Sequence, residues 1–218
     1  MRTNVLKFLS MVAVAVAIIG CKEKANEVET NAAKTTSEAK VTSVKYKADT
    51  AASSIAWTGF KPTGKHNGTI NIESGVFSVN DGKLESGTFL IDMNSIVVSD
   101  IPAENPRNAG LVDHLKNEDF FDVQKYGTAA FDITGFEVKE GKNMLSGNLT
   151  MKDKKNNITI PVTLKMEGDM MTITSEAFTI DRTKWDIRYK SKSIFGDLGD
   201  KFINDEIELK INVKAKAS

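Results

Sequence analysis

Side chains suited to catalysis or metal binding are few in these 218 residues and are spread along the chain. They include two histidines, His66 and His114, and one cysteine, Cys21. No cluster of His, Asp, Glu and Cys has metal-ligand spacing, and the sequence has no nucleophile elbow, phosphate-binding glycine loop or dinucleotide fingerprint. We therefore expect no metal site, no cofactor and no catalytic residue, and a protein that is not an enzyme.

The two histidines favour structural roles. His66 lies in the glycine-containing segment Thr63–Gly68, where a hydrogen bond to loop backbone is the simpler expectation. His114 stands beside Leu115 in a helical pattern and is expected on the helix surface or in its packing. One enzymatic hypothesis stays open, in which His66 and Asp181 act as acid and base on a lipid. Unchanged activity after His66→Ala would exclude it.

Cys21 has a different context. Arg2 and Lys7 precede the apolar run Met11–Ile19, which ends at Gly20 and Cys21. A charged start, a short apolar run and a small residue are typical of a secretory signal, and a membrane-spanning helix would need about 20 apolar residues. Cleavage at another bond is the plainer alternative, but Ile18-Ile19-Gly20-Cys21 resembles the bacterial lipobox. We therefore expect residues 1–20 to be a signal peptide and Cys21 to be acylated, a membrane anchor.

Residues 22–43 are Lys, Glu, Ala, Thr, Ser and Asn with almost no large apolar side chain, which predicts a flexible tether. Loss of Arg2 and Lys7 leaves 27 basic and 29 acidic residues, a net charge of −2, which argues against a nucleic-acid partner. Lys22 is not the aspartate that retains some lipoproteins at the inner membrane. By analogy, we expect a cell-envelope protein at the outer membrane that faces the periplasm.

Residues 44–218 read as one domain of strands, because apolar and polar side chains alternate with period two. The last strand is the clearest, since one face carries Ile207, Leu209, Ile211, Val213 and Ala215. Ile158, Ile160, Val162, Leu164 and Met166 form a second such face, within which Pro161 indicates an edge or bulge position. Elsewhere the alternation changes phase at Gly75, Gly87 and Gly135, which predicts three β-bulges.

Turn residues divide this domain. Asn80–Lys83, Glu140–Asn143, Lys154–Asn157 and Glu167–Asp169 have hairpin chemistry, so Thr69–Ile91 is expected to be one hairpin and Thr128–Ile180 a four-strand meander. Only Asn108–Lys116 has helical spacing. The pattern predicts an all-β fold, an antiparallel up-and-down β-barrel of about eight strands with one short α-helix. A two-sheet sandwich with a filled interior is the alternative.

The order and spacing of several segments resemble the YceI-like family, also called polyisoprenoid-binding proteins, from about Lys45 to Lys214. The segments are Ser54–Gly59, Gly64–Gly68, Leu90–Ile96, His114–Tyr126, Ser146–Thr150 and Phe178–Trp185. Gly127, Asp153 and Asp186 depart from the family's usual proline or glycine. The resemblance implies an extended lipocalin-like barrel whose hydrophobic tunnel takes an isoprenoid chain or a similar amphiphile, and it favours the barrel over the sandwich.

We therefore expect a protein that sequesters or carries a polyisoprenoid, a quinone or a comparable lipid. Strand aromatic and aliphatic side chains would form the tunnel wall: Trp57, Phe77, Phe89, Ile91, Met93, Phe131 and Phe178. Arginine and aromatic residues suit a phosphate or quinone ring, and those expected near the polar head are Arg182, Trp185, Arg188 and Tyr189. A homodimer stays open. The alternative is a filled barrel that binds a protein partner through loops such as Val98–Gly110.

Overall fold

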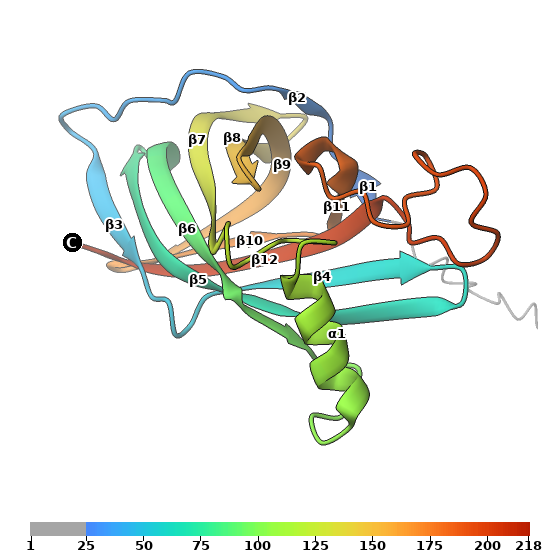
Figure 1. The fold of residues 1–218 in the computed structure, drawn as a ribbon. Coiled ribbons are helices and arrows are strands. Elements are labelled where there is room, and N and C mark those ends of the chain that lie inside the picture. The colour runs from blue at the N-terminus through green and yellow to red at the C-terminus, as the bar shows by residue number, and fades with distance from the viewer. Residues whose placement is uncertain (1–24) are drawn as a thin grey trace, which may run out of the picture.

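The computed structural model describes residues 25–218, so the expected signal peptide and Cys21 lie outside the described part of the chain. Eight antiparallel strands close into a ring (Figure 1), because β12 pairs with both β4 and β10. The eight are β4 (Ser54–Lys61), β5 (Gly64–Asn80), β6 (Lys83–Val98), β7 (Thr128–Lys139), β8 (Lys142–Met151), β9 (Lys154–Glu167), β10 (Met170–Ser175) and β12 (Glu206–Ala217). The predicted barrel is therefore confirmed.

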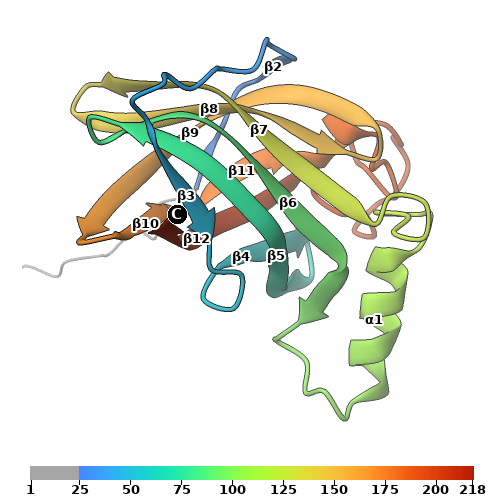
Figure 2. The same cartoon turned by 90° about the vertical axis from the view of Figure 1, so that its left-hand side faces the viewer.

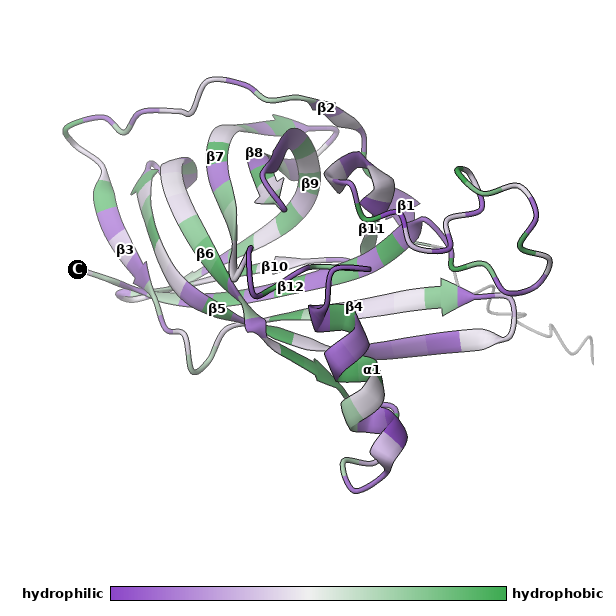
Figure 3. Ribbon diagram, viewed as in Figure 1, coloured by the Kyte–Doolittle hydropathy of each residue, from purple (hydrophilic) through white to green (hydrophobic). Residues whose placement is uncertain are grey.

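Two shorter strands lengthen this wall. β3 (Val44–Ala48) pairs with β5 and β12, and β11 (Phe178–Asp181) pairs with β12 beyond the end of β10. One face of each strand is apolar (Figure 3), and that alternation turns the apolar set into the barrel. Pro161 keeps its register with β8 but lies one residue before the ladder to β10 begins, so it sits at a local edge, as its missing N–H requires.

The turns between strands lie where the sequence predicted them, with one exception. Asp81 and Gly82, with φ of 49° and 72°, join β5 to β6 as expected for a type I′ hairpin. The β8–β9 turn, however, lies at Lys152 and Asp153, and the predicted turn residues 154–157 are already in β9. Neither turn residue there is glycine, so the sequence carried a weak signal at the true position.

The bulges are also shifted from their predicted places. β7 slips against β8 between Ile133 and Gly135, as expected, but the three slips between β5 and β6 fall at Ile70, Glu73 and Glu85. Gly75 and Gly87 serve close packing instead. A Cβ at Gly75 would lie 2.6 Å from the ring of Phe89, and one at Gly87 would overlap Phe77. The missing side chains therefore make room for two phenylalanines.

Residues 25–43, which we expected to be a tether without fixed contacts, lie along the barrel as a strap. Its first part, β1 (Asn26–Glu27), runs parallel to β11, and β2 (Thr30–Ala32) runs antiparallel to β9. β10 is short, so the edge of β11 and the first part of β9 have no pairing with it. β1 and β2 pair with these two edges. Val28 is buried between them. The strap is thus part of the wall, because it satisfies backbone groups that the eight strands do not.

Beyond β2 the strap continues over the outside of the barrel to β3 (Figure 2). Side chains hold it there: the Asn148 side chain donates to Lys34 O at 2.7 Å and accepts from Lys34 N at 2.9 Å. Further along, Glu85 accepts hydrogen bonds from Ser43 Oγ at 2.5 Å and from the backbone N–H of Lys40 at 2.9 Å. These two hydrogen bonds lower the pKa of Glu85 to about 2. Polar contacts therefore hold this segment, and the pattern of apolar residues in the sequence could not have predicted them.

One α-helix and one 3₁₀ helix stand at the same end of the barrel. α1 (Pro106–Lys116) links β6 to β7 and begins two residues before the predicted helix, with Asn105 as its N-cap. η1 (Arg182–Trp185) follows β11, and Asp181 caps it. No helix within residues 25–218 is long and apolar enough to cross a bilayer.

Candidate ligand cavity

The barrel encloses a cavity of about 650 Å³ that is lined mainly by apolar side chains. This volume lies within the roughly 300–1,000 Å³ typical of small-molecule sites. On β12 the wall is the predicted face, Ile207, Leu209, Ile211 and Val213, which runs about 20 Å along the strand. On β9 it is Ile158, Ile160 and Val162. A long apolar chain therefore has a deep, water-poor path here.

The cavity occupies only part of the barrel. At the end near the C-terminus, aromatic side chains of the neighbouring strands β3, β5 and β6 pack on one another: the ring of Phe77 stacks on Tyr46 at 5.5 Å and on Phe89 at 5.6 Å. Val79, Leu84 and Met171 are buried there and do not border the cavity. We call this part the filled end and the part around the cavity the hollow end.

Most residues that we expected in the tunnel wall do border the cavity. They are Trp57, Phe89, Ile91, Met93, Phe131 and Phe178. Phe77 does not, because it lies behind Phe89 in the aromatic stack of the filled end, with 1% of its surface exposed. The period-two pattern assigned its face correctly but could not show how far along the barrel the hollow extends.

Only two of the four residues expected near a polar head border the cavity. Tyr189 and Arg182 border the cavity, whereas Trp185 and Arg188 do not. Trp185 is fully buried, and its Nε1 donates to Leu149 O at 2.9 Å. Arg188 is an exposed residue whose Nε lies 2.6 Å from Asp186 Oδ1. These two side chains are therefore a packing residue and a surface ion pair.

Arg182 borders the cavity but its guanidinium binds the protein itself. It donates to the carbonyl oxygens of Ile187, Tyr189, Ile203 and Asn204 at 2.6–3.1 Å. Burial lowers its pKa, and the nearby Asp205 carboxylate opposes that shift. Arg182 thus ties residues 187–189 to residues 203–205, and we correct its expected role from a head-group ligand to a buried support of the cavity mouth.

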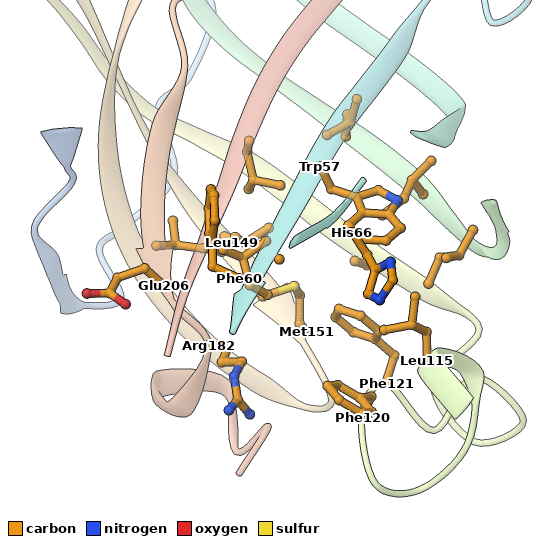
Figure 4. A pocket seen from close by; sticks show the side chains of 18 of the residues that line it. Trp57, Phe60, His66, Leu115, Phe120, Phe121, Leu149, Met151, Arg182 and Glu206 are labelled. Atoms are coloured by element: carbon orange, nitrogen blue, oxygen red, sulfur yellow. The ribbon is translucent and has the colours of Figure 1, made fainter. Parts of the chain in front are cut away.

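The mouth is formed by α1, the segment after it, the tip of the β4–β5 hairpin and the loop between η1 and β12 (Figure 4). His66 belongs to β5 and not to a loop, since Gly64 already pairs with Lys61. Its Nδ1 lies 2.8 Å from Asp100 Oδ2, and Asn67 N donates to the same carboxylate. Asp181, its partner in the enzymatic hypothesis, instead caps η1.

His114 is the second polar group at the mouth. Its Nε2 lies 3.0 Å from Asp119 Oδ2, and its ring meets Phe120 and Tyr189 edge-on at 5.1 and 4.9 Å. Both histidines therefore border the cavity while they are held by a carboxylate. Residues 25–218 contain no group of three His, Cys, Asp or Glu that could hold a metal ion.

Trp57 differs from the other tryptophan. Its side chain is buried against the cavity, yet its indole N–H has no hydrogen-bond acceptor among the described residues. An unpaired buried donor costs about 1–3 kcal/mol. The hollow end therefore leaves the indole N–H of Trp57 without an acceptor, whereas the packed site of Trp185 provides one for its indole N–H.

Several wall residues were not among those we singled out. The labelled examples in Figure 4 are Phe60, Leu115, Phe120, Phe121, Leu149 and Met151. Leu149 and Met151 alternate with Leu145 on β8, so the period-two pattern could have identified them. Phe120 and Phe121 lie between α1 and β7 in irregular chain, where no periodicity indicates a direction.

Comparisons with known proteins agree with this geometry. Residues 46–215 match the YceI-like domain, so the chain belongs to that family. The matched range starts at β3, and the strap lies before it. A search of curated proteins returned no match.

Two solved structures share the fold. BcnA of Burkholderia cenocepacia is 21% identical, with a TM-score of 0.57, and the match covers 78% of this chain and 99% of BcnA. A polyisoprenoid-binding domain from Saccharophagus degradans, implicated in plant cell wall breakdown, is 13% identical, with a TM-score of 0.56 and coverage of 80% and 99%. The family match and these two structures agree with the barrel described above.

Proposed function

We propose that this protein is a lipoprotein of the bacterial cell envelope that holds a polyisoprenoid, a quinone or a comparable long-chain lipid in its barrel, to sequester or carry it. The cavity of about 650 Å³ at the hollow end is the observation that carries the proposal. Burial of the apolar chain would drive binding at about 25 cal/mol per Å². The polyisoprenoid-binding neighbour supports this ligand class.

The position of polar groups supports an amphiphile over a pure hydrocarbon. The deep wall is Ile, Leu, Val and Phe, whereas His66, His114, Tyr189 and Lys190 gather at the mouth. An apolar chain would fill the interior and a polar head would remain among these groups. The competing hypothesis is a protein-binding module with a filled barrel, and the cavity argues against it.

The anchor and the location are proposed from the N-terminal sequence alone. Arg2, the apolar run to Ile19 and Cys21 support export and acylation, and Lys22 supports the outer membrane, facing the periplasm. Mass spectrometry of the full chain expressed in a bacterium tests this part. An acylated N-terminal Cys21 is expected, and it is lost in Cys21→Ser. A free N-terminus at another residue would overturn it.

Intrinsic fluorescence tests the cargo. Trp57 borders the cavity and Trp185 is buried outside it, so a bound polyprenol or long-chain quinone is expected to change the Trp57 signal. Trp57→Phe is the matched variant, because it keeps an aromatic wall and removes the reporter. No spectral change in the wild-type protein at any lipid concentration would contradict the proposal.

A further inference from the structure

The loop between η1 and β12 projects beyond the barrel at the cavity mouth (Figure 1). Its ends are close together, since Ile203 N donates to Lys190 O at 2.9 Å and Ser191 bridges to Ile203. Arg182 binds the carbonyls of Tyr189 and Ile203 at its base. Residues 190–203 are therefore a compact loop on a fixed, buried support.

The tip of this loop presents apolar side chains to solvent. Ile194 is 43% exposed and Phe195 is 48% exposed, and they are consecutive in sequence. Phe195 N donates to Ser191 O at 2.9 Å, so a turn of backbone holds the pair at the tip. These two side chains have no role in the barrel core, and together they form a small apolar patch at the tip of the loop.

Lysines surround these two side chains. The loop contributes Lys190, Lys192 and Lys201, and the tip of the β4–β5 hairpin contributes Lys61 and Lys65, against only Asp197 and Asp200 in the same two segments. None of the five lysines forms an ion pair with another residue of the range 25–218. Lys192 lies 4.9 Å from the ring centre of Phe202. The loop and the hairpin tip together therefore carry a net charge of +3.

The loop and the hairpin tip form one rim. Asn204 N donates to Phe60 O at 2.9 Å, and Lys61, Thr63, Lys190 and Lys201 all border the cavity. Figure 3 shows apolar stretches of the loop outside the barrel, on the same side as the hairpin tip. We define the rim as residues 61–65 and 190–203.

We propose that the rim docks on an anionic lipid bilayer, with Ile194 and Phe195 inserted at the boundary between headgroups and acyl chains. The lysines would contact anionic headgroups, and the open mouth would face the bilayer. The proposal deepens the proposed function, because a ligand could then enter without exposure of its chain to water. An acylated Cys21 fits this orientation, since Asn26 follows it by five positions, a span of at most about 18 Å.

Vesicle co-sedimentation tests the proposal. The chain of residues 22–218 contains every described element and lacks the apolar signal, so its binding reports the rim. With vesicles of equal parts phosphatidylglycerol and phosphatidylethanolamine, the wild-type chain is expected to sediment, and less so in high salt. The double variant Ile194→Ser, Phe195→Ser is expected to bind about tenfold more weakly. Val138→Ser, an exposed apolar residue at the far end of β7, is the matched control and should not change binding.

Two results would overturn the docking: no sedimentation of the wild-type chain, or equal binding by the double variant. Lys190→Gln with Lys192→Gln should weaken binding to these vesicles and not to pure phosphatidylcholine. The Trp57 fluorescence titration separates this proposal from the proposed function. If the chain binds a polyprenol but not vesicles, only the docking proposal is contradicted. If it binds vesicles but no lipid in solution, only the proposed lipid cargo is contradicted.

Discussion

The two ends of the barrel are built from the same strands but differ in what meets inside them. At the filled end, Phe77 stacks between Tyr46 and Phe89, and Gly87 lies directly against the Cα and Cβ of Phe77. At the hollow end, the facing Ile and Leu side chains do not reach one another, and the cavity of about 650 Å³ remains. Stability and binding are therefore separated along one barrel axis.

An empty apolar volume costs stability because its walls lose dispersion contacts. The filled end and the strap have to offset that cost. Substitutions of the same kind at the two ends should then have different effects: loss of stability at the filled end, and loss of binding at the hollow end.

The largest expected effect is at the centre of the filled end. Phe77→Ala removes a ring that is 1% exposed, so the free energy of unfolding should fall by about 3–5 kcal/mol. Phe131→Ala is the matched change at the hollow end. Because its ring already borders the cavity, we expect a loss of only about 1–2 kcal/mol. Urea denaturation measures both, and equal losses would contradict the division.

The buried support of the mouth comes next. Arg182→Met leaves the carbonyls of Ile187, Tyr189, Ile203 and Asn204 without their donors, and we expect a loss of about 3 kcal/mol. Hydrogen exchange should show faster exchange confined to residues 187–205. Protection equal to that of the wild type in this segment would show that Arg182 does not hold the mouth.

Gly87 and Gly147 (on β8) give a smaller and sharper contrast. A Cβ at Gly87 would lie 2.7 Å from Phe77 Cα and 2.8 Å from Val76 O, which are backbone atoms that cannot yield. The three atoms nearest to a Cβ at Gly147 all belong to the ring of Phe131, a side chain that borders the cavity. We expect Gly87→Ala to cost about 2–3 kcal/mol and Gly147→Ala about 1 kcal/mol. Only Gly147→Ala should also weaken lipid binding, and the reverse order would contradict the contrast.

The smallest effect concerns the strap. Since the pKa of Glu85 is lowered from 4.5 to about 2, its hydrogen bonds to Ser43 and Lys40 stabilise the strap above pH 4.5 and are lost as the pH falls towards 2. The amide resonance of Lys40 should shift over this interval. The Lys34 amide, bonded to the uncharged Asn148, is the internal control. An unchanged Lys40 amide at pH 2, or the same shift at Lys34, would contradict this role.

The sequence predicted the barrel because its signal repeats in every strand. Alternation assigned Ile207–Val213 and Ile158–Val162 to the interior, and six of the seven expected wall residues border the cavity. The seventh, Phe77, does not border the cavity, because alternation predicts which face of a strand is buried but not the position of a residue along the barrel axis. The head-group residues were harder to predict, because Arg182 donates to the carbonyls of Ile203 and Asn204 and Trp185 donates to that of Leu149, all of them distant in sequence.

The strap escaped prediction for a related reason. Residues 25–43 have few apolar side chains, so hydrophobic pattern indicated no contact. Their partners are polar: the backbone edges of β9 and β11, Asn148 and Glu85. Pairing of this kind depends on which edges the rest of the fold leaves bare, and that is known only after the barrel has closed.

Native mass spectrometry of residues 22–218, expressed in a bacterium and followed by organic extraction, tests the central claim most directly. We expect one bound lipid with a long apolar chain. It should be absent from Ala129→Trp, which fills the cavity wall, and retained in Ala56→Trp, which is the same change at an exposed position. A wild-type protein that stays free of lipid after incubation with polyprenols and quinones, or lipid retained equally in both variants, would contradict the account.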